Sequence, residues 1–201
     1  MPERPKLIIA TRNAHKTEEI RHILGHVFEI TDVTSIPGLP EIEETGTTFL
    51  ENARLKAFGI SARTGGWVLA DDSGLEVDAL DGRPGVWSSS FGGEEGNHAL
   101  NNERLIREMD GIADRTARFL CTLVLARDGK EKGVFRGTVE GRIAQTPSGG
   151  GGFGYDPLFI PEGYETSLAD LGAEVKSRLS HRSKAVRAFS DAVQRENILN
   201  F

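Results

Sequence analysis

The chain has 201 residues, a formal net charge of −6 and 24 glycines, and 38% of its residues are hydrophobic. This length allows one large domain or two small ones, with a sizeable core. The acidic balance argues against a general binder of nucleic acid or of acidic membranes, because neutralising many phosphates needs a basic surface. It leaves room for a small anionic ligand held by a local group of cations.

The only cysteine, Cys121, excludes a disulfide framework. It lies in an apolar run, residues 119–126, and nothing near it in the sequence would lower its pKa, so we expect a buried, reduced thiol. Residues 1–6 contain no apolar signal region, and no apolar run approaches the length that spans a bilayer. We therefore expect a cytoplasmic protein with no membrane partner.

The first predicted strand is the aliphatic run at residues 7–10, and a helical pattern follows it and ends at Gly25. The polar turn between them joins a strand to a helix N-terminus, where free N–H groups and the helix dipole favour an anion. Lys16, at the start of this helix, can reach a phosphate. The turn lacks the glycines of a Walker loop, and an ordinary turn with a solvated lysine also fits these residues.

A second strand is expected at residues 28–33, before an acidic turn that contains Glu43 and Glu44. The helix after this turn is expected at residues 48–64. Acids before a helix can simply favour its dipole. They can also supply a second set of carboxylates to a cation near Asp72.

The most informative stretch is residues 67–77. Its apolar first part predicts a buried strand, which we expect to stop at Asp71 and Asp72, to turn, and to resume afterwards. Carboxylates at the C-terminal end of a strand lie where open α/β sheets usually bind ligands. Two acids this close repel each other, which favours a bound cation or a raised pKa. An Asp-rich turn with Gly74 at a positive φ is the alternative without function.

A β-hairpin gives the clearest secondary-structure signal of the chain. Residues 116–127 alternate between apolar and polar side chains, and an Asp-Gly turn leads into a second strand at residues 134–143. A helix is expected before this hairpin, at residues 97–109.

Four consecutive glycines, residues 149–152, precede an aromatic-rich segment and a further strand at residues 158–160. A linker rarely continues in this way, and backbone without Cβ atoms permits close approach to a ligand. Phe153 and Tyr155 offer ring faces for stacking. A cationic cluster at residues 180–184 begins the last predicted helix and suits a phosphate or a purine oxygen.

Five motifs follow one another along the chain: Thr11-x-Asn13-x-x-Lys16, Glu43-Glu44-Thr45-Gly46, Asp71-Asp72-Ser73-Gly74, Gly152-Phe153-Gly154-Tyr155-Asp156-Pro157 and Ser180-His181-Arg182. In this order they resemble the HAM1/inosine triphosphatase family, pyrophosphatases that remove non-standard purine nucleoside triphosphates from the nucleotide pool. The resemblance covers almost the whole chain, from about Lys6 to the final helix. It departs at Trp87-Ser88-Ser89-Ser90-Phe91, where the family commonly has Tyr-Ser-Ala-Arg-Tyr, so an arginine is absent.

The resemblance implies an α/β fold: an elongated mixed β-sheet with flanking helices, in two lobes around a central cleft, as in HAM1-like and Maf-like proteins. Residues 1–201 would form this single domain, usually as a homodimer. The implied activity is hydrolysis of ITP, dITP or XTP to the monophosphate and pyrophosphate, with Mg²⁺ as the cofactor. A purine nucleoside triphosphate is then the expected partner, and nucleic acid is not.

The family's site residues are carried over by motif. Asp72 would accept the proton of the attacking water, and Lys16 would neutralise charge on the phosphate oxygens. Magnesium would be held by Asp72 with Glu43 or Glu44, and Asp71 is a further candidate ligand. The residues implied to contact the substrate, first the triphosphate and last the base, are Thr11, Arg12, Asn13, Ala14, His15, Lys16, Ser73, Phe153, Gly154, Tyr155, Asp156, Lys176, His181 and Arg182.

Two other functions remain open at this point. One is a Maf-like pyrophosphatase that acts on pyrimidine or modified nucleotides. The other is a nucleotide-binding sensor without catalysis, against which the presence of both Asp72 and Lys16 speaks. The sequence also leaves open whether water attacks the α- or the β-phosphorus.

Overall fold

The computed structural model describes residues 4–196. Its helices and strands, apart from short 3₁₀ turns, are β1 (Lys6–Ile9), α1 (Ala14–Leu24), β2 (Glu29–Asp32), α2 (Phe49–Thr64), β3 (Val68–Val77), α3 (His98–Glu108), β4 (Thr116–Arg127), β5 (Lys130–Ile143), β6 (Phe159–Pro161), α4 (Leu168–Leu179) and α5 (His181–Glu196).

Within the described residues, the strands form a six-stranded sheet in the order β2-β1-β3-β4-β5-β6. The sheet is mixed, because β1 pairs in parallel with β2 and β3, whereas β5 and β6 are antiparallel. The predicted α/β class, a mixed sheet with flanking helices, is therefore confirmed.

The chain forms two compact units, and β3, β4 and β5 each contribute residues to both. In the described part, unit 1 consists of residues 4–72, 121–137 and 182–196, and unit 2 of residues 73–120 and 138–181. The single domain of residues 1–201 stays a prediction, and its residues 1–3 and 197–201 lie outside the described part.

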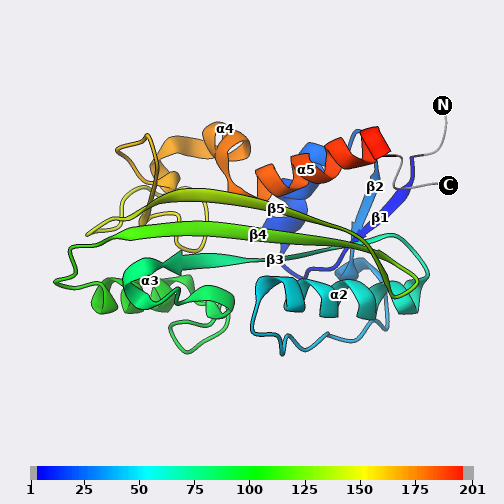
Figure 1. Ribbon diagram of the computed structural model, residues 1–201, viewed down its shortest axis with the longest axis horizontal. Helices are drawn as coiled ribbons and strands as arrows, with labels where there is room; N and C mark the ends of the chain where they lie inside the picture. Colours follow the sequence, from blue (N-terminus) through cyan, green and yellow to red (C-terminus); the bar gives the residue numbers. More distant parts are fainter. Residues whose placement is uncertain (1–3, 197–201) are drawn as a thin grey trace. The chain divides into compact units, whose positions relative to one another are not determined.

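In unit 1, helices cover both faces of the sheet, with α2 on one face and α1 and α5 on the other (Figure 1). The alternation of side chains along β3 and β4 produces these layers. Leu69, Leu123 and Leu125 belong to the core cluster that includes α1 and α5. Val68 and Val124, their neighbours in sequence, belong to the cluster that includes α2. The sheet of unit 1 is thus apolar on both faces.

Unit 2 has a core of its own. Leu105 of α3 and Met109, which follows this helix, pack with strand residues such as Phe119 and with Leu168 at the start of α4. Tyr155 is also buried in this core. The glycine-rich segment is therefore anchored to unit 2 by one of its two aromatic residues.

One strand prediction is wrong. β3 does not stop at Asp71 but runs without interruption from Val68 to Val77, and Gly74 is not among the residues with positive φ. The turn was predicted because two carboxylates, a hydroxyl and a glycine follow the apolar run, and carboxylates in the middle of a buried strand are costly. Here that cost is offset by cations that pair with Asp71 and Asp72.

Helix α4 was not predicted. Gly172, in the middle of this element, has φ 79° and ψ 166°, so the backbone leaves the helical region at that residue. The apolar pattern is interrupted at the same point, and neither half alone is long enough to give a helical signal. The other predicted strands and helices are confirmed, with differences only at their ends.

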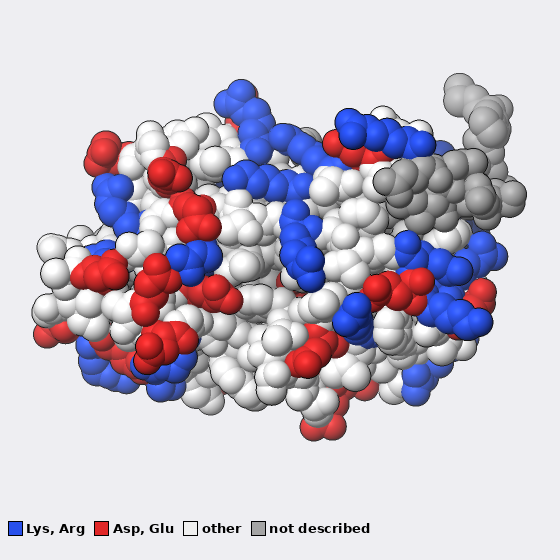
Figure 2. Space-filling view, in the orientation of Figure 1, with Lys and Arg blue, Asp and Glu red and all other residues white. Residues whose placement is uncertain are grey.

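Two surface properties bear on partners. Among residues 4–196, no helix combines the length and the apolar character needed to cross a membrane. On the face drawn in Figure 2, basic and acidic side chains lie next to one another over much of the surface.

Candidate active site

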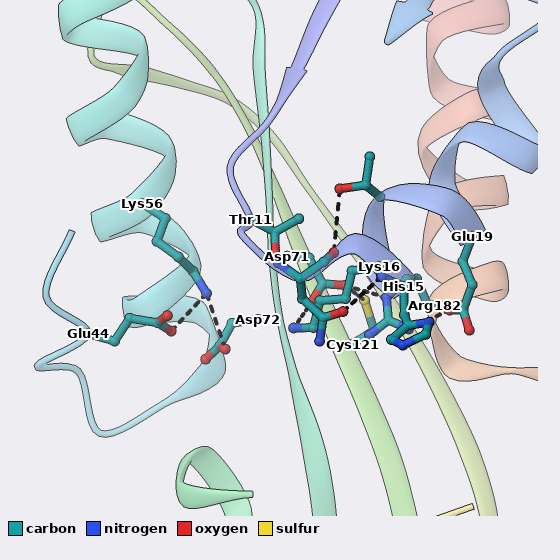
Figure 3. A network of polar contacts seen from close by, with 12 residues as sticks. Thr11, His15, Lys16, Glu19, Glu44, Lys56, Asp71, Asp72, Cys121 and Arg182 are labelled. Atoms are coloured by element: carbon teal, nitrogen blue, oxygen red, sulfur yellow. Dashed lines mark hydrogen bonds and ion pairs between the residues drawn. The ribbon is translucent and has the colours of Figure 1, made fainter. Parts of the chain in front are cut away.

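Two carboxylates in the middle of β3 face opposite sides of the strand, because successive side chains alternate. Asp71 is 0% exposed and Asp72 is 7% exposed. Each has its own set of polar neighbours (Figure 3): Asp71 pairs with Lys16 and Arg182, and Asp72 pairs with Lys56. All of these residues belong to unit 1.

Both oxygens of Asp71 accept hydrogen bonds. Oδ1 accepts from Lys16 Nζ at 2.5 Å, and Oδ2 accepts from Arg182 Nε at 2.9 Å and from Cys121 Sγ at 3.2 Å. Arg182 Nη1 also donates to Glu19 Oε2 at 2.5 Å. Burial raises the pKa of Asp71, but the charges of Arg182 and Lys16 outweigh it and hold this pKa well below its usual value. Asp71 is therefore a fixed anion at neutral pH.

Several residues that were singled out in the sequence lie around Asp71. The ammonium of Lys16, expected at a phosphate, lies on Asp71. Arg182, expected at the base, is 2% exposed and lies between Asp71 and Glu19. Cys121 is a buried thiol, as predicted. Burial and the nearby Asp71 raise the pKa of this thiol well above its usual value, so it keeps its proton and donates it.

Asp72 belongs to a second group, with Lys56 and Glu44. Lys56 Nζ lies 2.8 Å from Glu44 Oε2 and 3.4 Å from Asp72 Oδ1. One ammonium thus contacts carboxylates from two segments that are distant in sequence (Figure 3). The other oxygen, Asp72 Oδ2, is buried and has no hydrogen-bond partner in the described part of the chain.

The pKa of Asp72 moves in the opposite direction to that of Asp71. Burial raises it to about 6, from an ordinary value of 3.8, although the ammonium groups of Lys56 and Lys16 oppose the shift. Burial also lowers the pKa of Lys56, but the charges of Asp72 and Glu44 outweigh it and raise this pKa above its usual value. Lys56 is therefore a cation at neutral pH.

The structure distinguishes the two acids of the turn before α2. Glu44 contacts Lys56, whereas Glu43 is exposed and its side chain makes no ion pair or hydrogen bond with residues 4–196. Ile42 packs against the core cluster that includes α2. Glu44 is consequently the acid of this turn that reaches the neighbourhood of Asp72.

Glu44 and Asp72 fit a magnesium ion. No group of three or more His, Cys, Asp or Glu side chains within the described residues could hold a metal. Mg²⁺ needs fewer protein ligands, because it keeps several waters and is usually bound by one or two carboxylates together with substrate phosphates. The ammonium of Lys56 already contacts both acids, so a positive charge fits between them. The buried Asp72 Oδ2 has no hydrogen-bond partner among the described residues.

Thr11 and Asn13 organise the turn before α1. Asn13 caps the helix: its Oδ1 accepts from the N–H groups of His15 at 2.9 Å and Lys16 at 3.3 Å. Thr11 Oγ1 accepts from the N–H of Asn13 at 3.1 Å. Two of the N–H groups expected to bind an anion are thus bonded to the cap, which sets Lys16 in the first turn. The predicted contacts of this turn that are exposed are Arg12, Ala14 and His15.

In unit 2, three of the predicted base-contacting residues form a group. Asp156 Oδ2 accepts from the N–H of Phe153 at 2.8 Å and from Lys176 Nζ at 2.7 Å. Lys176 Nζ lies 4.2 Å from the centroid of the Phe153 ring. The ring of His98, which was not predicted, has its centroid 6.2 Å from that of Phe153. Tyr155, by contrast, is 3% exposed, so its ring belongs to the core.

The remaining predicted residues of unit 2 are Gly154, His181 and Ser73. Gly154 has φ 65°, which only glycine adopts easily, and its carbonyl accepts from Asn102 Nδ2 at 3.0 Å. His181 is buried and stacks on Phe119, with ring centroids 4.9 Å apart. Ser73 is half-buried in β3.

No site role was predicted for Lys56 or Glu19, and the contact of Cys121 with Asp71 was not predicted. For Lys56 the sequence carried a signal, because the helix at residues 48–64 is unusually polar for its length. Glu19 and Cys121 carried none, since their contacts join segments that are far apart in sequence.

We predict that Asp71→Asn destabilises the protein by roughly 3–5 kcal/mol at pH 7, since it removes the counter-charge of two buried cations. Because the folded pKa of Asp71 is lowered, its contribution is full above the unfolded pKa and is lost as the pH falls through the folded value. Urea unfolding of wild type and variant at pH 7 and pH 3 should therefore show a difference that shrinks in acid. A difference that is small at pH 7 would contradict this prediction.

Asp72→Asn should change the stability in the opposite direction to Asp71→Asn. The folded pKa of Asp72, about 6, exceeds its ordinary value of 3.8, so ionising this carboxyl lowers stability as the pH rises between these values. The variant avoids this cost and should be more stable than wild type at pH 8, by up to about 3 kcal/mol at 1.36 kcal/mol per pKa unit. At pH 4 the two should be nearly equal. Urea unfolding in the presence of EDTA measures both stabilities. A variant that is less stable than wild type at pH 8 would refute this prediction.

Comparison with known proteins gives one family throughout. A sequence model of the Ham1 family matches residues 7–192. The dITP/XTP pyrophosphatase of Exiguobacterium sp. is 49% identical over 183 residues, which cover 90% of this chain and 93% of that protein. The dITP/XTP pyrophosphatase of Oceanobacillus iheyensis is 45% identical over 185 residues, 90% of this chain and 94% of its own.

Solved structures agree with these sequence matches. The Staphylococcus aureus Ham1 protein superimposes with a TM-score of 0.87 and 35% identity, covering 95% of this chain and 99% of its own. The nucleoside-triphosphatase or dITP/XTP pyrophosphatase of Mycobacterium abscessus gives a TM-score of 0.77 and 38% identity, with coverages of 92% and 98%. By sequence and by fold, this chain belongs to the Ham1 family.

Proposed function

We propose that this protein is a pyrophosphatase that hydrolyses non-standard purine nucleoside triphosphates, such as dITP, ITP and XTP, to the monophosphate and pyrophosphate. The observation that carries this proposal is that the carboxylates of Glu44 and Asp72 both contact the ammonium of Lys56. It occurs in a chain whose relatives, at 45–49% identity, bear the name dITP/XTP pyrophosphatase.

Glu44 and Asp72 would hold a magnesium ion, with the remaining positions left to water and phosphate oxygens. The ion would screen the charge of the triphosphate and acidify a bound water. Asp72 acts as the proton acceptor for the attacking water. Its buried Oδ2 has no hydrogen-bond partner among the described residues, and burial raises its pKa to about 6. A bound cation would lower this pKa, but it would also acidify the attacking water, so Asp72 can still accept the proton of that water.

Lys16 supplies positive charge to the phosphates. Its ammonium donates to Asp71 Oδ1 at 2.5 Å, and its backbone N–H donates to the Asn13 cap at the start of α1. An ammonium held in place stabilises the charge that builds up on phosphate oxygens without reorganising in the transition state. The exposed residues of the same turn, Arg12 and His15, are proposed to add contacts to the triphosphate.

Recognition of the base is assigned to the group in unit 2. Phe153 offers a ring for stacking, and Lys176, held by Asp156, offers a donor. A donor rewards a 6-oxo purine, which presents an acceptor where adenine presents an amino group. The roles expected for His181 and Arg182 at the base, and for Ser73 at the substrate, remain part of this proposal. Removal of such nucleotides from the cellular pool implies a cytoplasmic location.

The activity test uses purified protein with Mg²⁺ and a panel of nucleoside triphosphates. We expect ITP, dITP and XTP to give monophosphate and pyrophosphate with a far higher kcat/KM than ATP. Asp72→Asn should lower kcat by about 100-fold or more, the usual contribution of a general base. Reaction in ¹⁸O-water identifies the attacked phosphorus, because label in the monophosphate means attack at the α position.

The neighbouring acids provide a matched control for this test. Glu44→Gln should lose most of the activity and need more Mg²⁺, whereas Glu43→Gln should behave as wild type, since only Glu44 contacts Lys56. Free phosphate as the sole product would refute the assigned bond. A preference for pyrimidine or modified nucleotides would favour a Maf-like enzyme, and tight binding without turnover would favour a sensor.

A homodimer is proposed for the assembled protein. Trp87 is 63% exposed, the most exposed of the large hydrophobic residues in the described part, and it lies in the segment that departs from the family pattern. Sedimentation velocity should give about twice the chain mass of 21.9 kDa. Trp87→Ser should shift the equilibrium toward monomer. A wild-type protein that sediments as a monomer at tens of micromolar would overturn the dimer.

A further inference from the structure

The loop that carries Glu44 is tied to the first turn of α2 at Gly46. The N–H of Gly46 donates to Asn52 Oδ1 at 2.7 Å, and Asn52 is 3% exposed. A Cβ on Gly46 would lie 2.7 Å from this Oδ1 and 2.6 Å from Glu51 Cβ. Only glycine therefore allows the loop to approach the helix this closely.

A second tie fixes the residues that follow Gly46. Glu51 Oε2 accepts from the N–H of Thr47 at 2.8 Å and from the N–H of Thr48 at 3.1 Å. The Thr48 side chain accepts from the N–H of Glu51 in return, which completes a capping box. Glu51 thus caps the N-terminus of α2 on its exposed side. Asn52 holds Gly46, which is nearer to Glu44 in the loop.

Asn52 and Lys56 are one helical turn apart and share a face of α2. Asn52 fixes the backbone at Gly46, and Lys56 contacts the carboxylates of Glu44 and Asp72. Glu44 precedes Gly46 by two residues, and each residue spans at most about 3.6 Å. The position of Gly46 therefore limits where the Glu44 carboxylate can lie.

We propose that Asn52 is a positioning residue for the metal site: through Gly46 it fixes the loop so that Glu44 and Asp72 reach one divalent cation. This inference rests on the proposed function, because it concerns the same pair of carboxylates. Asn52 itself does not bind the ion. Its role resembles that of residues that orient metal ligands from outside the coordination sphere, whose removal typically weakens metal binding by about 10–100-fold.

The test measures Mn²⁺ binding to the metal-free protein, without nucleotide, by electron paramagnetic resonance of the free ion. Asn52→Ala should bind Mn²⁺ at least about tenfold more weakly than wild type. Asn52→Asp keeps an oxygen that accepts from Gly46 and should bind at least as tightly as wild type. Glu51→Ala is the matched control: it also destabilises this loop and helix, but it should leave the Mn²⁺ affinity within a small factor of the wild-type value.

A second readout separates positioning from general destabilisation. If the loop is only misplaced, raising the Mg²⁺ concentration should restore kcat of Asn52→Ala toward the wild-type value with ITP as substrate. If circular dichroism shows that Asn52→Ala does not fold, Gly46→Ala replaces it, because the added Cβ pushes the loop away from the same oxygen. This variant should show the same loss of Mn²⁺ affinity.

The outcomes separate this inference from the function it rests on. Wild-type protein that binds no Mn²⁺ at millimolar concentration would overturn both the magnesium site and the role of Asn52. Wild-type binding with an equal affinity in Asn52→Ala and Glu51→Ala would overturn the role of Asn52 alone. Weaker binding confined to the Asn52 and Gly46 variants, with recovery in Asn52→Asp, supports it.

Discussion

The structure of unit 1 depends on the burial of two adjacent carboxylates inside β3. A buried charge is tolerated only when a cation or several donors lie beside it. Here the cations come from three helices: Lys16 from α1, Arg182 from α5 and Lys56 from α2. Because the two acids face opposite sides of the strand, these helices must cover both faces of the sheet. The helices that cover the two faces of the sheet are consequently the same helices that supply cations to Asp71 and Asp72.

The two acids differ in how completely their charge is balanced, and this difference separates their chemistry. Asp71 has two cations and a thiol on its oxygens, so its pKa is low and its position is fixed. Asp72 shares one ammonium with Glu44 and keeps a buried oxygen without a partner in the described residues, so its pKa is raised to about 6. Of the two environments, the second is better suited to a proton acceptor. The stability lost at Asp72 is typical of functional sites, and the pairing at Asp71 on the same strand offsets part of it.

The sequence allowed much of the fold to be predicted, because the alternation of apolar residues is a local signal and holds in β4 and in the helices. The order of the motifs also indicated the family. Prediction from the sequence failed where the structure depends on residues that are far apart in the chain. A turn was expected at Asp71, since the cations that neutralise this acid lie 55 and 111 residues away and gave no local signal. Helix α4 was missed because Gly172 interrupts it. Of the candidate acids, the choice of Glu44 over Glu43 needed the position of Lys56.

Two side chains of α2, Lys56 and Asn52, hold the neighbourhood of Glu44 and Asp72 together in different ways. Two carboxylates brought together repel each other unless a positive charge lies between them. Lys56 supplies that charge, but its long side chain is flexible and alone would leave the acids free to separate once it moved. Asn52 holds the backbone of the Glu44 loop by a buried hydrogen bond that involves no charge. β3, an interior strand of the sheet, holds the backbone at Asp72. The positions of the two acids therefore depend on backbone contacts as well as on the ammonium of Lys56.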